Sequence, residues 1–185
     1  MISKKISHIL PILLGFFFCF MVSAGFLFAK DTSKAAETLR DLNLQIVAAN
    51  GNHDLSGALR AAEKAARVAK VEYGESSLEA ANAMNNLGNL YAFADWASEA
   101  EQLFKKAILI YLEKSDMNGT GMADIYFNLG VAYAMQKKYK DAINILNKAL
   151  VIRHEKLGPD NAATKKTEQM INELTKLTYP KTEKI

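Results

Sequence analysis

Apolar side chains recur every three or four positions through most of the chain after residue 36, with polar side chains between them. In the first such segment, Leu39, Leu42, Ile46 and Ala49 would share one face of a helix. No stretch alternates convincingly with the period of two that marks a half-buried strand. The pattern therefore predicts an all-α fold, with helices at residues 37–49, 55–72, 78–94, 98–114, 122–136, 139–156 and 161–177.

Clusters of turn-forming residues separate the predicted helices. Residues 50–54 read Asn-Gly-Asn-His-Asp, and Gly74 suits the left-handed position that often follows a helix. The longest connection spans residues 115–121, and Gly158 with Pro159 ends the sixth helix. These breaks group the first six helices into three hairpins and leave the seventh, which is polar on one side, as a terminal helix.

The second and third hairpins are copies of each other. Adding 42 to each residue number maps NLGNLY at residues 86–91 onto NLGVAY at residues 128–133. Twelve positions are identical between residues 81–114 and residues 123–156, whereas residue usage alone would give roughly two or three. A repeat of this length is typical of solenoids, in which each hairpin buries its apolar face only by stacking on its neighbours.

The two copies share small and apolar residues at fixed positions, which in the first copy include Asn86, Leu87, Gly88, Tyr91, Ala100, Phe104 and Ala107. This signature resembles the tetratricopeptide repeat. The spacing of 42, with EKLGPD at residues 155–160, is similar to the kinesin light chain type of that repeat. The resemblance implies a short right-handed α-solenoid of helix-turn-helix repeats with a C-terminal capping helix.

The resemblance and the turns together give the expected domain boundaries. A repeat domain is expected at residues 37–177 and a disordered tail at residues 178–185. The first repeat departs from the signature, since Ile46 stands where the glycine belongs, and Asp95 replaces the usual turn glycine of the second. The three repeats and the capping helix are expected at about residues 37–73, 78–114, 120–156 and 160–177.

The N-terminal segment predicts export. Lys4 and Lys5 precede residues 9–29, which carry no charge, as in a secretory signal peptide. Small residues at positions 22 and 24 favour cleavage after Ala24, with Ala29 as a second candidate, so residues 1–24 are the predicted signal and the mature chain is expected to be periplasmic or secreted. The alternative is that residues 9–29 stay as a single membrane-anchoring helix, because 21 residues just cross a bilayer.

Composition argues against several classes of function. Without the two N-terminal lysines, 21 basic residues face 20 acidic ones, so no electrostatic footprint for nucleic acid is expected. Cys19 lies in the signal segment, and His53 and His154 lack the spacing of metal ligands. Catalytic and phosphate-binding motifs are also missing from the sequence. We therefore expect no enzyme, no metal and no cofactor.

The resemblance implies that the first helix of each repeat lines a concave face that holds a partner. Asparagine carries both a donor and an acceptor, so asparagines beside apolar anchors suit an extended or helical peptide. The alternative is that Asn86 and Asn128 only tie neighbouring helices together. By helical position, the residues expected on this face are Asn82, Asn85, Asn86, Asn89, Phe93, Asp124, Phe127, Asn128, Val131 and Met135.

These expectations favour a non-catalytic protein–protein interaction module, an exported scaffold that binds a protein or peptide. The membrane alternative is an anchored assembly factor, or a subunit of an envelope complex. Basic residues do not occupy the inner positions of either strong repeat, and Lys166 is the sole candidate nearby, so recognition of acidic tails is not expected. Self-association through the first hairpin stays open.

Overall fold

The computed structural model describes residues 32–114 and 119–179. The predicted signal peptide, the alternative anchor and residues 180–185 of the predicted tail lie outside the described residues. The chain divides into two compact units, Met1–Lys34 and Ala35–Ile185. Of the first unit only residues 32–34 are described, and the account below concerns the second.

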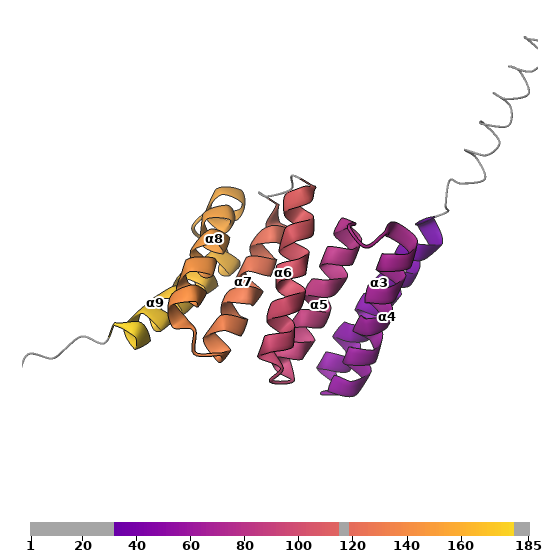
Figure 1. Cartoon of the computed structure of the whole chain (residues 1–185), viewed down its shortest axis with the longest axis horizontal. Coiled ribbons are helices and arrows are strands. Elements are labelled where there is room, and N and C mark those ends of the chain that lie inside the picture. Colours follow the sequence, from indigo (N-terminus) through magenta and orange to yellow (C-terminus); the bar gives the residue numbers. More distant parts are fainter. Residues whose placement is uncertain (1–31, 115–118, 180–185) are drawn as a thin grey trace, which may run out of the picture. The chain divides into compact units, whose positions relative to one another are not determined.

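The described residues form helices and contain no strand. Each predicted helix is present; six begin and end within two residues of the prediction, whereas the first begins at Thr32, five residues earlier than predicted. Consecutive helices lie side by side (Figure 1). The helices are α3 (Thr32–Gly51), α4 (Leu55–Tyr73), α5 (Leu78–Phe93), α6 (Ala97–Glu113), α7 (Thr120–Met135), α8 (Tyr139–Leu157) and α9 (Ala162–Thr178).

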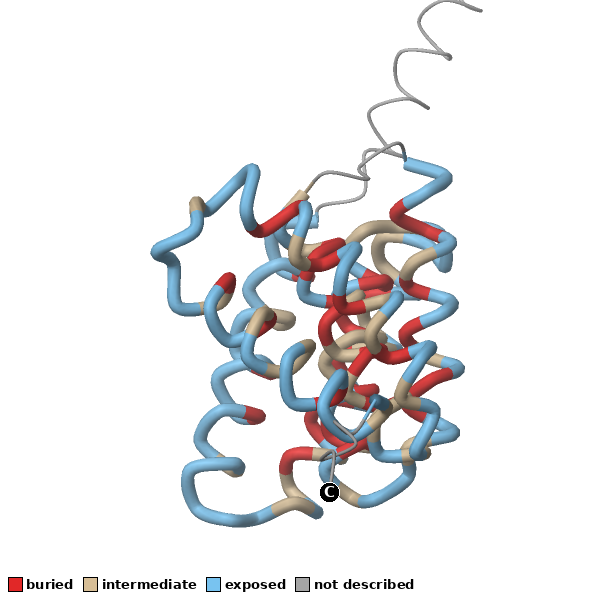
Figure 2. Tube along the Cα trace, turned by 90° about the vertical axis from the view of Figure 1, so that its left-hand side faces the viewer, coloured by how far each residue is buried: buried red, intermediate tan, exposed pale blue. Residues whose placement is uncertain are grey.

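The apolar core runs through the stack from hairpin to hairpin. One buried cluster joins α3 and α4 to α5, a second joins α5 and α6 to α7 and α8, and a third joins α7 and α8 to α9. Figure 2 shows the buried residues where the helices face one another and the exposed residues on their outer sides. The first hairpin fills its core mainly with small side chains, namely Ala58, Ala61, Ala62, Ala65 and Ala69 of α4.

Glycine lets the two helices of each strong hairpin approach closely, as the signature predicts. A Cβ atom added at Gly88 of α5 would lie 2.7 Å from Cε1 of Phe104 on α6. At Gly130 of α7 it would lie 2.6 Å from Cγ of Leu146 on α8. Since Phe104 and Leu146 are fully buried, neither has free space into which it could move.

All three hairpin turns share one backbone conformation. His53, Asp95 and Lys137 are 42 residues apart, and each has a left-handed φ, of 57°, 65° and 60°. In each turn the following N–H bonds back to a carbonyl of the preceding helix, as in Trp96 N to Tyr91 O at 2.8 Å, which is the pattern of a Schellman cap. The first hairpin therefore follows the same register despite its divergent sequence.

Helix α9 also keeps this register. Helices α5, α7 and α9 begin at Leu78, Thr120 and Ala162, which are successively 42 residues apart. The position of Gly88 and Gly130 is occupied in α9 by Asn172, which is exposed. Helix α9 therefore takes the position of the first helix of a further repeat, with a polar side chain in place of the glycine.

A polar cluster joins the second hairpin to the third. Glu101 of α6 is buried and accepts hydrogen bonds from Lys105, Gln136 and Lys138. Burial alone would raise the pKa of the Glu101 carboxyl, but these three hydrogen bonds outweigh it and lower the pKa from 4.5 to about 2. Both lysines also lie within 6 Å of the Tyr133 ring centroid, at 5.7 and 5.4 Å, a distance typical of cation–π contacts.

Candidate protein-binding groove

Three adjoining hollows lie along the first helices of the three hairpins, α3, α5 and α7. We call these hollows together the groove. The hollow at the α3–α4 turn, called the turn pocket, has a volume of about 460 Å³. The hollow between α5 and α7 measures about 400 Å³, and a smaller one between α3 and α5 about 200 Å³. Asn89 lines all three hollows, and Phe93 lines the two larger ones.

Six of the ten residues that the sequence places on the concave face line the groove. Phe93 and Met135 are exposed apolar side chains of the groove, with 77% and 40% of their surface accessible. Asn82 and Asn85 of α5, and Asp124 and Phe127 of α7, do not line these hollows. The six that line them are Asn86, Asn89, Phe93, Asn128, Val131 and Met135.

Most of the predicted asparagines are engaged in bonds between helices. The Nδ2 atom of Asn86 donates to Oδ1 of Asn43 on α3 at 3.1 Å. Asn128 of α7 donates likewise to Asn85 of α5 at 2.9 Å. These bonds tie neighbouring helices together, which is compatible with a purely structural role of Asn86 and Asn128 and with a role in partner contact as well.

Asn82 is engaged as well, and Asn89 differs from the other four. The Oδ1 atom of Asn82 accepts from the Tyr111 hydroxyl at 2.7 Å. Asn89 is exposed, and its side chain makes no hydrogen bond to any part of the chain that the structure describes. Its amide therefore stays available to a partner.

Asp124 and Phe127 belong to a network that holds α9. Arg153 of α8 is buried and donates to Oδ1 of Asp124 and to Oγ1 of Thr167, each at 2.7 Å. Its guanidinium lies 4.6 Å from the Phe127 ring centroid, and Lys166 Nζ lies 5.3 Å from the same centroid. Phe127 is only 7% exposed. The expectation that it presents an apolar anchor to a partner is therefore not met, because its ring is covered by this network.

The groove contains residues that the sequence analysis did not select. Asn50, His53 and Leu55 line the turn pocket, and Val47 lines the smaller hollow. The repeat register could have revealed two of them, because subtracting 42 from Asp95 gives His53 and from Asn89 gives Val47. Asn50 and Leu55 have no counterpart in the signature.

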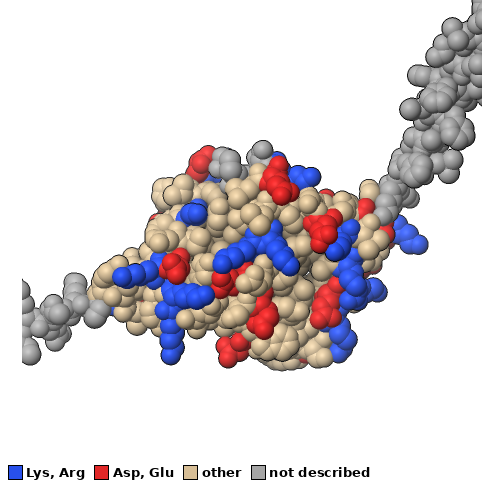
Figure 3. Space-filling model, viewed as in Figure 1, with Lys and Arg blue, Asp and Glu red and all other residues tan. Residues whose placement is uncertain are grey.

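Charged side chains are missing from the lining of all three hollows. On the face shown in Figure 3, basic and acidic residues are interspersed over the surface. Within residues 32–114 and 119–179, no three His, Cys, Asp or Glu residues are grouped so as to hold a metal ion. In the same residues no helix has the length and apolar character needed to cross a membrane.

Comparison with known families identifies the two strong hairpins. Residues 80–114 and residues 123–156 each match the tetratricopeptide repeat. Both hairpins are tetratricopeptide repeats. This homology supports a scaffold for protein–protein interaction, which is a non-catalytic kind of fold.

Solved structures resemble about three quarters of the chain. The crystal structure of BtubC (BKLC) from P. vanneervenii matches with a TM-score of 0.67 and 20% identity, over 76% of this chain and 56% of that one. The TPR2B domain of yeast Sti1, solved as a complex with pHsp70, matches with a TM-score of 0.59 and 17% identity, over 76% of this chain and 98% of that one. These likenesses confirm the predicted all-α solenoid.

A longer protein also shares part of the sequence. The clustered mitochondria protein homolog of Coccidioides immitis (strain RS) is 26% identical over 106 residues, which is 57% of this chain. The match spans 8% of the length of that relative. The match therefore concerns a short segment of a much longer protein.

Proposed function

We propose that this chain is an exported, non-catalytic scaffold that binds a protein or peptide partner in the groove. The observation that carries the proposal is Asn89, whose free amide lies where the three hollows meet. An asparagine amide donates and accepts at once, so it can pair with a peptide group whatever the partner's side chain. The exposed side chains of Phe93 and Met135 supply apolar contact next to this amide.

Relatives with related folds support a partner of this kind. The Sti1 domain was solved with pHsp70 bound, so one similar structure is known in complex with a protein partner. The repeat spacing of 42 favours assignment of this chain to the kinesin light chain-like type of tetratricopeptide repeat. We assign direct contact with the partner to the six predicted residues that line the groove. The other four, Asn82, Asn85, Asp124 and Phe127, hold the helices of the groove in place.

Site-specific photocrosslinking in the source cells tests the binding site. A photoreactive phenylalanine analogue replaces Phe93 in one variant and Val151 in another. Val151 is as exposed, at 66% against 77%, but lies on α8 outside the three hollows. We expect a discrete crosslinked species from position 93 only, which weakens when Asn89→Ala is added. Equal crosslinking from both positions, or none from position 93, would contradict the proposal.

Export is the second part of the proposal. Lys4 and Lys5, followed by the uncharged residues 9–29 and small residues up to Ala24, favour a cleaved signal peptide and a periplasmic or secreted scaffold. The length of the uncharged stretch favours the alternative, a membrane-anchored assembly factor or envelope-complex subunit. The intact mass of the protein from fractionated cells separates them. A soluble chain starting at Gly25 supports the scaffold, and a full-length chain in the membrane fraction supports the anchored subunit.

A further inference from the structure

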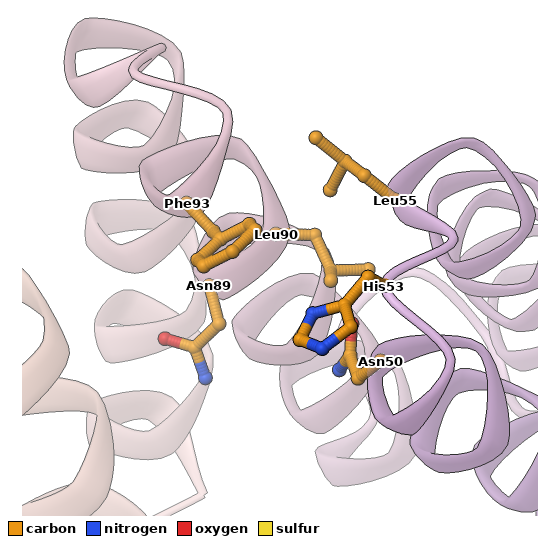
Figure 4. A pocket seen from close by; sticks show the side chains of 6 residues that line it. All are labelled: Asn50, His53, Leu55, Asn89, Leu90 and Phe93. Atoms are coloured by element: carbon orange, nitrogen blue, oxygen red, sulfur yellow. The ribbon is translucent and has the colours of Figure 1, made fainter.

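The turn pocket is the most enclosed part of the groove (Figure 4). Leu90 of α5, only 4% exposed, forms its base, and Phe93 and His53 face each other across it. Leu55, at the start of α4, completes the wall. A volume of about 460 Å³ falls within the range of roughly 300–1,000 Å³ typical of ligand pockets.

The repeat register explains why the groove is open at this point. Phe93 of α5 corresponds to Met135 of α7 and Leu177 of α9, each 42 residues further on, and all three are exposed apolar side chains. The corresponding residue of α3 is Gly51, where an added Cβ atom would meet no heavy atom within 4 Å. The row of large apolar side chains therefore lacks its first member, next to the turn pocket.

The chemistry of the lining restricts what can enter. None of the six lining residues is an acid, a lysine or an arginine, so a charged group placed there would lose water without gaining an ion pair. Asn50 of α3 and Asn89 of α5 both line the pocket. Neither side-chain amide makes a hydrogen bond within the described residues, so both can bond to a backbone that passes over the pocket.

We infer that the turn pocket takes one large apolar side chain, aromatic or Leu or Met, from an uncharged extended segment of the partner, whose backbone bonds to Asn50 and Asn89. This inference rests on the proposed function and names the chemistry of the segment that is bound. His53 and Phe93 clasp the side chain, and the register places it in line with Met135 and Leu177. Specificity for the partner is then set in the first hairpin, where the repeat signature is weakest.

A defined peptide library tests this assignment. The probes are end-blocked nonapeptides with a fixed central residue, in separate pools carrying Trp, Phe, Leu, Ala, Asp or Lys, and with Gly, Ala, Ser and Val randomised elsewhere. Binding of each pool to the purified repeat protein is followed by fluorescence anisotropy. We expect the Trp, Phe or Leu pool to bind about tenfold or more tightly than the Ala pool, because burying such a side chain contributes that much.

Two matched variants locate the preference. His53→Asn removes the ring from the turn pocket but keeps a residue that tolerates the left-handed turn. Met135→Ala removes an apolar side chain from the neighbouring hollow between α5 and α7, and His53 does not line that hollow. We expect His53→Asn to reduce the preference for the large apolar pools several-fold and Met135→Ala to preserve it.

Three results would overturn the assignment: a preference for Asp or Lys, a preference that His53→Asn leaves intact, or no binding by any pool. Crosslinking from position 93 then decides whether the proposed function fails with it. If the crosslink persists, the proposed scaffold function holds and the partner has a different chemistry. If the crosslink is absent, the proposed function and the assignment of the turn pocket both fail.

Discussion

The side-chain amide of Asn128 on α7 donates a hydrogen bond to Oδ1 of Asn85 on α5, and Asn86 repeats this bond to Asn43 one hairpin earlier. Each bond spans 43 residues, one more than the repeat. Between α7 and α9, 42 residues further on, Phe127 takes the position of the acceptor and Met170 that of the donor, and both belong to the same apolar cluster. The helices are therefore joined by amides along the groove and by apolar contact at the terminal helix.

Replacing Asn128 by Ala should lower the free energy of unfolding by about 1 kcal/mol, since it removes a partly buried hydrogen bond and leaves Asn85 unpaired. Asn86→Ala is the matched change at an exposed bond and should cost less. Urea unfolding of both variants measures the difference. A larger loss for Asn86→Ala would show that exposure does not control the contribution of these bonds.

Replacing Gly88 or Gly130 by Ala should destabilise the protein by roughly 1–3 kcal/mol, because the added methyl group overlaps Phe104 or Leu146. Gly51→Ala is the control, since its Cβ meets nothing and its φ is not left-handed. That change should be neutral or stabilising by up to about 1 kcal/mol. Thermal unfolding of the three variants should separate them clearly, and a stable Gly88→Ala variant would refute the close approach.

Stability should fall in acid through Glu101. Because its pKa in the folded protein is lowered from 4.5 to about 2, its contribution is complete above pH 4.5 and is lost as the pH falls towards 2. The contribution is at most roughly 3 kcal/mol. Glu101→Gln should therefore be less stable than the wild type at pH 7, with the difference shrinking below pH 4.5. Denaturant unfolding as a function of pH measures this.

The control for Glu101 is Glu75, whose carboxylate pairs with Lys70 at an exposed site. The hydrogen bond and the charge of Lys70 lower the pKa of Glu75 as well, but exposed pairs contribute little. Glu75→Gln should consequently leave the pH profile of stability nearly unchanged. A profile altered as much as that of Glu101→Gln would mean that burial is not what matters.

Removing the exposed partner of Arg153 should cost more than removing the buried arginine itself. Asp124→Ala leaves the charge of Arg153 buried without its carboxylate, at a cost of about 3–5 kcal/mol. Arg153→Met also removes the hydrogen bonds of the guanidinium and its contact with the Phe127 ring, but it leaves no buried charge and an exposed Asp124, so we expect a smaller cost of about 1.5–3 kcal/mol. Hydrogen exchange in α9 compared with α5 measures both, and the opposite order would contradict the argument.

The fold could be predicted from the sequence because its information is local and repeated. Apolar spacing located all seven helices, and the offset of 42 identified the close approaches at Gly88 and Gly130. Asp95 raised a question about the second turn, and the structure answers it, since His53 and Lys137 adopt the same left-handed conformation. Once the turn hydrogen bonds are formed, glycine is not required at this position.

The site could be predicted only in part, because it depends on contacts between separate helices. Phe127 is buried by the apolar cluster that it forms with α8 and α9 and by Arg153, which reaches its ring from α8, and nothing in the α7 sequence indicates these contacts. Helical position alone also could not show that Asn82 is bonded to Tyr111, whereas the side chain of Asn89 has no hydrogen bond among the residues that the structure describes. The turn pocket draws its residues from the end of α3, the turn and α5, so no single periodic pattern includes them.

The extent of the three hollows sets the length of the partner segment that the groove can hold. The residues that line the three hollows come from α3, α5 and α7, and from the turn and first residue of α4 that follow α3. Packed helices lie roughly 8–10 Å apart, so three of them span roughly 20–30 Å, which an extended chain covers with about six to nine residues. The groove therefore limits the length of the segment that it can bind. A segment of that length fills it, and a longer one extends beyond the three hollows.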